Sequence, residues 1–384
     1  MRIGIPMKAF DPEWGGPGTY TIELVNRMIN LGGEHEYVLI YPSDISGRAS
    51  KPQTGKAVQE LATSRRRGII WDQLTMPALV RKAGIDVLFS PFMSIPIRGD
   101  YPKVFTIHGA ERYVVPGMLR ADQYLRWVFM DGVLTRLAHR IIAVSETMAK
   151  EYCRATGCDP RKVRSIPLGV GSHFTVLNDA AGLTATRAKF NLPQDYLLFV
   201  GRIFPNKNFG NLLRAFARIE KQIPHKLVVA GGVRWRFEDD LALVDQLGLR
   251  DRVQFLDFVN RDELVHLYNM ATCFVYPSFY ESFGLAQVEA MACGCPVVAA
   301  NTGALPEIAG DAALFCDPKS PEEIAGAIMR LVSEPQLHAQ QRAKGLERAR
   351  LYTWERCARA TLDVLVESSL EPDSSRKSLN RGVE

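Results

Sequence analysis

The sequence contains no run of about 18 uncharged apolar residues, the length that a membrane-spanning helix needs. Its seven cysteines are scattered, and although Cys293 and Cys295 stand one residue apart, no CxxC pair occurs. This pattern argues against a disulfide framework or a zinc site and predicts a reducing, cytoplasmic location. Residues 1–10, MRIGIPMKAF, lack the apolar core of a signal peptide and predict a first strand instead.

A basic stripe interleaved with aromatic residues is also missing, so we expect no nucleic-acid partner. The net charge is only +5, and the sharpest basic cluster is Arg65, Arg66 and Arg67. This cluster has two open interpretations: a solvated loop, or a contact with anionic lipid or a phosphorylated substrate. With 47% hydrophobic and 23% charged residues over 384 positions, the chain is typical of a soluble globular protein with room for two domains.

Short apolar runs rich in β-branched residues recur between helical segments throughout the chain. Helical spacing is clearest in residues 209–219, where Phe209, Leu212, Leu213, Phe216 and Ile219 fall on one face. Strands that alternate with helices indicate βαβ units and parallel sheets. The expected strands are 2–6, 37–41, 86–90, 104–107, 140–144, 163–166, 196–200, 226–230, 253–256, 273–276 and 296–300.

The strand pattern breaks near residues 168–192, which are rich in small and polar residues. We therefore predict an α/β protein of two Rossmann-like, doubly wound domains, 1–170 and 171–352, that face a cleft. A final helix over 353–370, with Thr353 as its N-cap, is expected to pack back on the first domain. The polar residues 371–384 predict a disordered tail.

Ligands of parallel α/β sheets bind at the carboxyl ends of the strands, where two loops of the first half carry unusual residues. Gly15, Gly16 and Gly18 follow the first strand and lead into a helix, an arrangement that suits an anion, although an ordinary glycine-rich turn would look the same. Their spacing does not fit the GxGxxG dinucleotide fingerprint. His108 ends a predicted strand, where it could hydrogen-bond a polar ligand.

In the second half, VGRIFPNKNFG places Arg202 just after a strand and Lys207 just before a helix. The order strand, basic residue, turn, basic residue, helix predicts a clamp for a diphosphate. The alternative is a pair of solvated charges on a loop.

The segment YESFGLAQVEAMACGCP combines two glutamates with a helix start. Ser282 is the expected N-cap, and the helix should run to about Cys293. Glu281 and Glu289 would then be separated by a rise of roughly 12 Å, too far to share one metal ion or one proton. This spacing suits a long ligand such as a nucleotide sugar, with a hydroxyl pair at each end and the diphosphate at the helix N-terminus.

Several of these segments together resemble the retaining GT-B glycosyltransferases of family 4. The segment from residue 281 to 307 resembles the family's E-x7-E motif, and GRIFPNKNFGNLLRAF resembles its Gly-Arg…Lys-Asn segment. GGPGTY, TIHGAE, IIAVSETMAKEY and GDAALFCDP resemble its glycine loop, two linking elements and a late strand. The resemblance implies the GT-B fold and transfer of a sugar from a nucleotide donor to a hydroxyl group, with retention at the anomeric carbon.

The resemblance also implies roles for four charged or polar residues. Glu281 would contact the donor sugar, Arg202 and Lys207 would neutralise the diphosphate, and His108 would position the donor sugar or the acceptor. Family members usually need no metal, and the sequence has no Asp-x-Asp triplet, so we expect neither a metal nor a cofactor.

The remaining implied donor contacts come from the two glycine-containing loops. Glu289 would bind the ribose hydroxyls, Gly15 and Gly16 would approach the phosphates, and Ser282, Phe283, Gly284 and Leu285 would line the donor site. Ser282 stands where the family's commonest form has glycine, which puts the shape of the sugar pocket in doubt. The sequence offers no convincing carboxylate for a covalent intermediate, and the resemblance implies front-face attack assisted by the leaving phosphate.

Two other functions stay open at this point: a nucleotide-sugar 2-epimerase of the same architecture, and a non-catalytic nucleotide-sugar-binding protein. For a transferase, relatives of this size favour a GDP-sugar, with mannose or a deoxyhexose, over a UDP-sugar, and a saccharide or lipid-linked oligosaccharide acceptor in cell-surface polysaccharide synthesis. Residues 119–140 could form an interfacial amphipathic helix on the cytoplasmic face of a membrane, with Leu125, Val128, Phe129, Gly132 and Val133 on one side. The alternative is a helix packed on the first sheet.

Overall fold

The computed structural model describes residues 1–8, 15–31, 33–45, 58–115, 120–231, 237–256 and 259–370. The chain divides into two compact units, one formed by Met1–Gly169 with the described residues 353–370, the other by Val170–Tyr352. The chain first passes from one unit to the other after Gly169, one residue before the boundary that the sequence predicts. The expected disordered tail, residues 371–384, lies outside the described residues.

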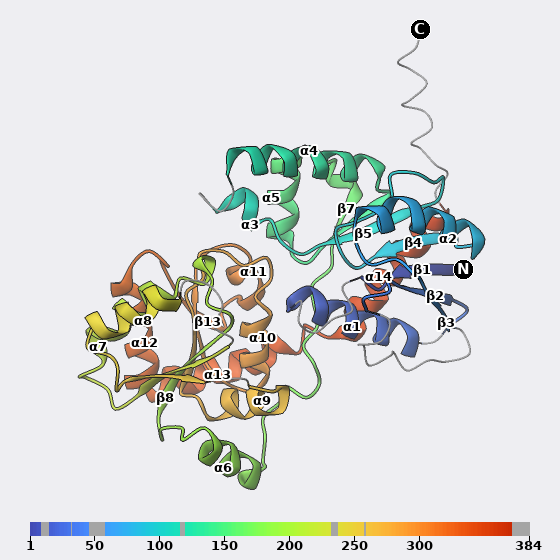
Figure 1. The fold of residues 1–384 in the computed structure, drawn as a ribbon. Helices are drawn as coiled ribbons and strands as arrows, with labels where there is room; N and C mark the ends of the chain where they lie inside the picture. The colour runs from blue at the N-terminus through green and yellow to red at the C-terminus, as the bar shows by residue number, and fades with distance from the viewer. Residues whose placement is uncertain are drawn as a thin grey trace. The chain divides into compact units, whose positions relative to one another are not determined.

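The first unit is built on a parallel sheet of seven strands in the order β3-β2-β1-β4-β5-β6-β7 (Figure 1). The inner strands are almost wholly buried because helices cover both faces, which explains their continuous apolar sequences. The strands are β1 (Arg2–Pro6), β2 (Glu36–Tyr41), β3 (Val58–Ala62), β4 (Val87–Ser90), β5 (Lys103–Ile107), β6 (Arg140–Ala143) and β7 (Val163–Ser165).

The second unit repeats the plan with a parallel sheet of six strands in the order β10-β9-β8-β11-β12-β13. Its core joins Leu197 and Phe199 of the sheet to Leu212 and Phe216 of a covering helix, as the helical spacing predicts. The strands are β8 (Tyr196–Val200), β9 (Lys226–Ala230), β10 (Val253–Leu256), β11 (Cys273–Tyr276), β12 (Val297–Ala300) and β13 (Ala313–Cys316).

The helices of the first unit divide between the two faces of its sheet. Right-handed crossovers place α1 on one face and α2, α4 and α5 on the other. The helical segments are α1 (Gly16–Asn30), the π-helix η2 (Trp71–Thr75), α2 (Met76–Lys82), α3 (Glu111–Val114), α4 (Ala121–Leu137), α5 (Glu146–Thr156) and η3 (Pro160–Lys162).

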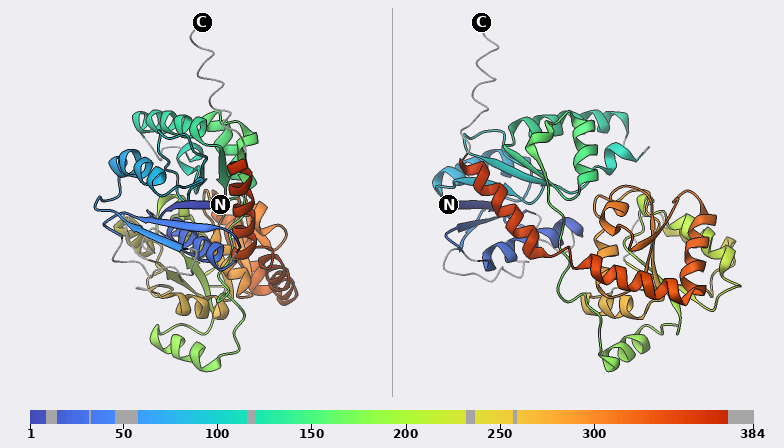
Figure 2. Two further views of the ribbon diagram at one scale, coloured as in Figure 1. Left: turned by 90° about the vertical axis from the view of Figure 1, so that its right-hand side faces the viewer. Right: turned by 180° about the vertical axis from the view of Figure 1, so that it is seen from behind.

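The last helix, α14 (Trp354–Leu370), contacts α1 and strands β4, β5 and β6 of the first unit. Figure 2 shows it in red along the sheet. The Thr353 hydroxyl accepts a hydrogen bond from the backbone N–H of Arg356 at 3.2 Å, which is the cap that the sequence predicts. The helical segments of the second unit are α6 (Ala180–Lys189), η4 (Pro205–Lys207), α7 (Phe209–Ile219), α8 (Phe237–Gln246), α9 (Arg261–Met270), α10 (Leu285–Ala292), α11 (Leu305–Ala309), α12 (Pro321–Ser333) and α13 (Pro335–Ala349).

Candidate active site

Two loops at the carboxyl edge of the second sheet are joined by hydrogen bonds. The loop after β8 carries Lys207, and the loop after the neighbouring strand β11 carries Glu281. Asn208, which follows Lys207, is buried and donates from its side chain to the carbonyls of Pro277 and Pro318. Asn208 also takes a left-handed conformation, with φ of 58°, as the N-cap of α7. The predicted basic loop is therefore held against the predicted acidic loop.

Lys207 and Glu281 form an ion pair, with Lys207 Nζ 2.6 Å from Glu281 Oε1. Lys207 also donates to the Tyr276 hydroxyl at 3.0 Å, and its side chain is 19% exposed against 13% for Glu281. Burial lowers the pKa of Lys207, but the Glu281 carboxylate and Tyr276 outweigh it, so this pKa lies well above its usual value. The ammonium group is therefore charged at any physiological pH.

Glu289 lies on α10 in a different environment. Its Oε2 accepts a hydrogen bond from the Tyr268 hydroxyl at 3.4 Å. Burial raises the pKa of Glu289 to about 7, while the Tyr268 hydrogen bond and the charge of Arg261 act in the opposite direction. This carboxyl group is thus half protonated near neutral pH.

The start of α10 differs from the sequence prediction. Ser282 is not the N-cap, because the helix begins at Leu285 and its N-cap is Gly284, with φ of 85° and no side-chain cap. Glycine is required there, since a Cβ atom on Gly284 would lie 2.5 Å from Leu305 Cδ2. Only residues from 285 onward are helical, so the rise of roughly 12 Å expected between Glu281 and Glu289 is wrong as a helical distance. The helix ends where the sequence predicts, with Cys293 as its C-cap, and Gly294 then takes a left-handed conformation.

The other residues predicted to line the donor site have mixed surroundings. The Phe283 side chain is buried against the ring of Tyr352, so only its backbone can serve a ligand. The first N–H groups of α10, from Leu285, have no side-chain cap and can meet an anion. Ser282 and Arg202 are each partly buried in their loops.

Gly303 is a site residue that the sequence analysis missed. It has a left-handed φ of 55°, and a Cβ atom on it would lie 2.6 Å from the Glu281 carbonyl oxygen. The next residue, Ala304, donates its N–H to the same oxygen at 2.9 Å. The loop after β12 therefore fixes the backbone of Glu281. The available signal was the glycine three residues past a strand end, in NTGALPE.

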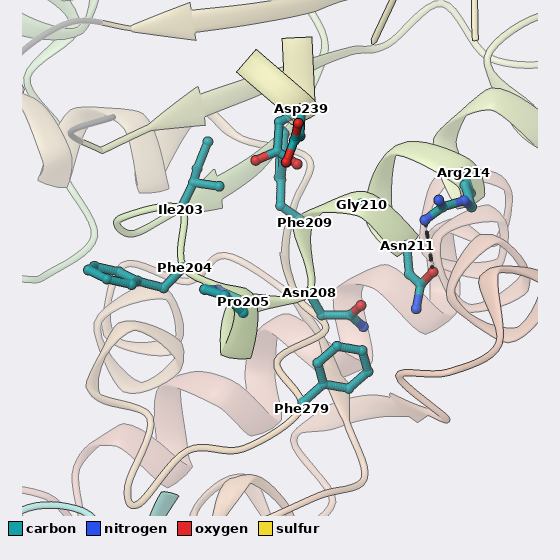
Figure 3. A pocket seen from close by; sticks show the side chains of 11 residues that line it. Ile203, Phe204, Pro205, Asn208, Phe209, Gly210, Asn211, Arg214, Asp239 and Phe279 are labelled. Carbon is teal, nitrogen blue, oxygen red and sulfur yellow. Dashed lines mark hydrogen bonds between the residues drawn. The ribbon is translucent and has the colours of Figure 1, made fainter. Parts of the chain in front are cut away.

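A cavity of about 340 Å³ adjoins the basic loop (Figure 3). Phe204, Asn208, Arg214, Asp239 and Phe279 are among its lining residues, and Arg214 donates to Asn211 there. Lys207, Glu281 and Glu289 do not line it. The cavity and the Lys207–Glu281 ion pair therefore involve the same loop but are separate sites.

In the first unit, His108 is fixed at the end of β5 by three neighbours. Its ring meets Tyr20 edge to face at 4.8 Å and stacks on Phe92 at 6.3 Å, and Nε2 lies 2.6 Å from the Pro91 carbonyl oxygen. Because a carbonyl can only accept, Nε2 carries the hydrogen and Nδ1 the lone pair. Burial lowers the pKa of His108 to about 4, although the hydrogen bond to Pro91 opposes the shift. The imidazole is therefore a neutral hydrogen-bond acceptor at neutral pH.

Gly15 and Gly16 open the helix α1, as the sequence predicts. Gly15 is the N-cap, with φ of 64° and no side-chain cap. Within the described residues, a Cβ atom on either glycine would meet no other atom within 4 Å. Among the described residues, no three acidic, histidine or cysteine side chains group as metal ligands, and metal independence stays a prediction.

Comparisons with known proteins agree with these features. The family described as Glycosyltransferase Family 4 matches residues 14–173, and the family described as Glycosyl transferases group 1 matches residues 184–348. O-antigen chain mannosyltransferase B of Escherichia coli is 33% identical over 231 residues, which are 59% of this chain and 60% of that protein. D-inositol 3-phosphate glycosyltransferase of Thermobifida fusca is 36% identical over 242 residues, which are 59% of this chain and 54% of that protein. The chain thus aligns with little more than half the length of either relative.

A solved structure supports the fold alone. Anabaena Alr3699/HepE in complex with UDP and glucose matches with a TM-score of 0.74 at 18% identity, over 96% of this chain and 100% of that one. With two parallel Rossmann-like units, the paired Lys207 and Glu281, and family matches to both units, the chain belongs to the GT-B glycosyltransferases of family 4.

Proposed function

We propose that the protein is a retaining hexosyltransferase that moves mannose or a deoxyhexose from a GDP-sugar to a hydroxyl of a saccharide or lipid-linked acceptor in cell-surface polysaccharide synthesis. The observation that carries the proposal is the Lys207–Glu281 pair at the carboxyl edge of the second sheet. The mannosyltransferase among the relatives supports the choice of sugar.

In this proposal Lys207 and Glu281 act as one unit on the donor. The ammonium has three N–H groups, of which Glu281 and Tyr276 accept two among the described residues, so the third can reach a diphosphate oxygen. Glu281 keeps Oε2 for hydroxyl groups of the donor sugar. As the sugar leaves, the charged lysine and Arg202 stabilise the negative charge that develops on the diphosphate. This supply of positive charge is the reason to expect that the reaction needs no metal.

Glu289 and His108 would bind the donor's hydroxyl groups. Only the carboxylate form of Glu289 accepts hydrogen bonds from two ribose hydroxyls, so donor binding lowers its pKa and releases its proton. His108, neutral with its lone pair on Nδ1, accepts from a sugar hydroxyl and positions the sugar rather than transferring a proton. Gly15 and Gly16 would approach the phosphates through the uncapped start of α1.

We further propose that the protein contacts the cytoplasmic face of a membrane through α4. No helix among the described residues is long and apolar enough to span a bilayer. On α4, however, Leu125 and Phe129 are 67% and 69% exposed, and the exposed Arg126 lies between them in the sequence. The helix packs against α5 (Figure 1), and Leu125 and Phe129 stay exposed within the described residues. An exposed apolar pair beside an arginine suits an anionic lipid surface that carries a lipid-linked acceptor.

The experiment that tests the proposal is a product assay on a panel of GDP- and UDP-sugars, first ranked by thermal shift. A glycosylated acceptor with the donor's anomeric configuration, formed best from a GDP-sugar, is expected. An inverted product would remove retention from the proposal, and preference for a UDP-sugar would remove the choice of base. Release of a free epimer would favour the epimerase.

A further inference from the structure

A second ion pair stands at the carboxyl edge of the first sheet. Lys8 stands two positions after the end of β1. Its Nζ lies 2.6 Å from Asp72 Oδ2 and 3.4 Å from Ser94 Oγ. The two charged side chains are 15% and 13% exposed. Ligands of parallel sheets bind at this edge, and β1 and β4 are neighbours there.

Asp72 is held by an unusual piece of backbone, the π-helix η2. Three consecutive side chains of η2 reach three different loops of the unit: Trp71 donates to Thr63 Oγ1, Asp72 accepts from Lys8, and Gln73 bonds to the backbone of residues 95 and 97. The π-helical turn is rare and often marks a functional position. Because hydrogen bonds hold the residues before and after Asp72, its carboxylate is preorganised for a ligand.

The pair is connected to His108 through one short segment of the chain. The segment that runs from Pro91 to Ser94 contacts His108 at one end, through the Pro91 carbonyl and the Phe92 ring, and contacts Lys8 at the other, through Ser94. The backbone N–H of Ser94 also donates to the Phe92 carbonyl at 2.7 Å, which keeps the segment compact. Because an acceptor hydroxyl must come within about 3–3.5 Å of the anomeric carbon, its binding site has to border the residue that positions the donor sugar.

We propose that Lys8, Asp72 and Ser94 form the subsite for the acceptor, and that this acceptor is an uncharged, hydroxyl-rich saccharide unit. The inference rests on the proposed transferase function. The ammonium has three N–H groups and two partners among the described residues, so one donor is left, and the carboxylate keeps Oδ1 as an acceptor. A donor beside an acceptor matches adjacent sugar hydroxyls, each of which can accept and donate. A phosphate at the same place would face the Asp72 carboxylate, which disfavours an anionic acceptor.

The test uses the full chain with the nucleotide sugar that gives turnover, and octyl α-mannoside or inositol 3-phosphate as acceptor. The variant is Asp72→Asn, and the matched control is Glu220→Gln. Glu220 pairs with Arg252 at 3.1 Å and is also 13% exposed, but Arg252 precedes β10 and so lies at the opposite edge of its sheet. Thermal unfolding accompanies each variant. If Asp72→Asn fails to fold, Ser94→Ala replaces it.

We expect transfer to octyl α-mannoside in preference to inositol 3-phosphate. Asp72→Asn should raise the acceptor KM about 10- to 100-fold, as loss of hydrogen bonds to a charged group does, and leave the donor KM unchanged. Ser94→Ala should raise it several-fold, and Glu220→Gln should change neither constant. The subsite is overturned if Asp72→Asn keeps the acceptor KM, or if Glu220→Gln raises it equally. Preference for inositol 3-phosphate overturns the uncharged acceptor.

Failure of the proposed function would look different, because no donor would then give transfer to either acceptor. In that case, saturation-transfer NMR of octyl α-mannoside decides the inference. Signal with the wild type and Glu220→Gln but not with Asp72→Asn supports the subsite, and any other pattern overturns it.

Discussion

Lys207 and Glu281 are 74 positions apart in the sequence, yet Nζ and Oε1 lie 2.6 Å apart at the carboxyl edge of the second sheet. The pair is electrically neutral before a donor binds. It is also preorganised, because Asn208 and Tyr276 hold the lysine's loop and ammonium group. A site built in this way offers one cationic donor to a diphosphate and one carboxylate oxygen to a sugar, without further rearrangement of either side chain.

Replacement of the lysine should remove most of the activity. We expect Lys207→Ala to lower kcat about 10²- to 10³-fold, the usual loss when one preorganised charge-stabilising group is removed. Lys189→Ala is the matched control, since Lys189 also pairs with a glutamate, Glu263, in the same unit. Steady-state kinetics with thermal unfolding separates activity from folding. A Lys207→Ala enzyme with full activity would contradict the role of the pair.

Glu289 makes a prediction about pH. Because its folded pKa of about 7 lies above its usual value of 4.5, the folded state holds the proton more tightly, and stability falls as pH rises from about 4.5 to 7. Glu289→Gln should therefore stabilise the ligand-free protein at pH 8, by at most about 3 kcal/mol, and weaken donor binding. Denaturant unfolding at pH 5 and pH 8 measures the first effect, and calorimetric titration with the donor the second.

Donor affinity of the wild type should itself fall as pH drops below about 7, since the proton has to leave before the carboxylate can accept two ribose hydroxyls. In Glu289→Gln this dependence should flatten. An unchanged pH profile in the variant would show that another group titrates.

Gly303 tests whether the backbone of Glu281 must stay in place. Gly303→Ala combines a strained φ of 55° with a Cβ atom 2.6 Å from the Glu281 carbonyl, so Glu281 must shift. We expect kcat to drop at least about tenfold, because a shift of 1 Å at a reacting centre can cost that much or more. Gly326→Ala on α12 is the control, since a Cβ atom there meets nothing within 4 Å. Equal activity of both variants would count against the positioning role.

The proposed membrane contact depends on two apolar side chains of α4. Changing Leu125 and Phe129 together to Ser should lower binding to phosphatidylglycerol vesicles at least about tenfold, because each loses the burial of a large apolar side chain. Leu351→Ser, at a position 47% exposed in the other unit, is the control. Vesicle flotation measures binding. Equal flotation of both variants would rule out this surface. So would wild-type binding to phosphatidylcholine vesicles that equals its binding to phosphatidylglycerol vesicles.

Metal independence is tested by a chelator. EDTA should leave turnover unchanged, because Lys207 and Arg202 supply the positive charge that magnesium supplies elsewhere. Activity that is lost and then restored by magnesium would refute the prediction.

Sequence patterns predicted the inner strands well, and each expected strand ends within one residue of the observed one. Buried parallel strands need apolar, β-branched runs, so their sequences carry the signal. The edge strand β3 was missed because VQELA is partly exposed and half polar, and only its pairing with β2 makes it a strand. Ser282 was mistaken for a cap because a serine before an apolar run is a common helix start, while the required left-handed turn at Gly284 leaves no such trace.

At the candidate site, the sequence predicted individual residues but not how they pair. Motif spacing pointed to Lys207, Glu281 and Glu289 one by one, whereas the ion pair between the first two depends on β8 and β11 being neighbours in the sheet. Asn208 and Gly303 act through backbone contacts with residues far along the chain, which a single sequence does not reveal. The same is true of the ion pair between Lys8 and Asp72, because Asp72 lies on a π-helix that no periodicity predicts.

The most direct measurement is a crystal structure of the full chain with GDP-mannose bound. We predict that the diphosphate lies within hydrogen-bond distance of Lys207 Nζ, with both ribose hydroxyls on the Glu289 carboxylate. A diphosphate that is bound without Lys207, for example in the cavity beside Phe204 and Phe279, would contradict the donor site described above.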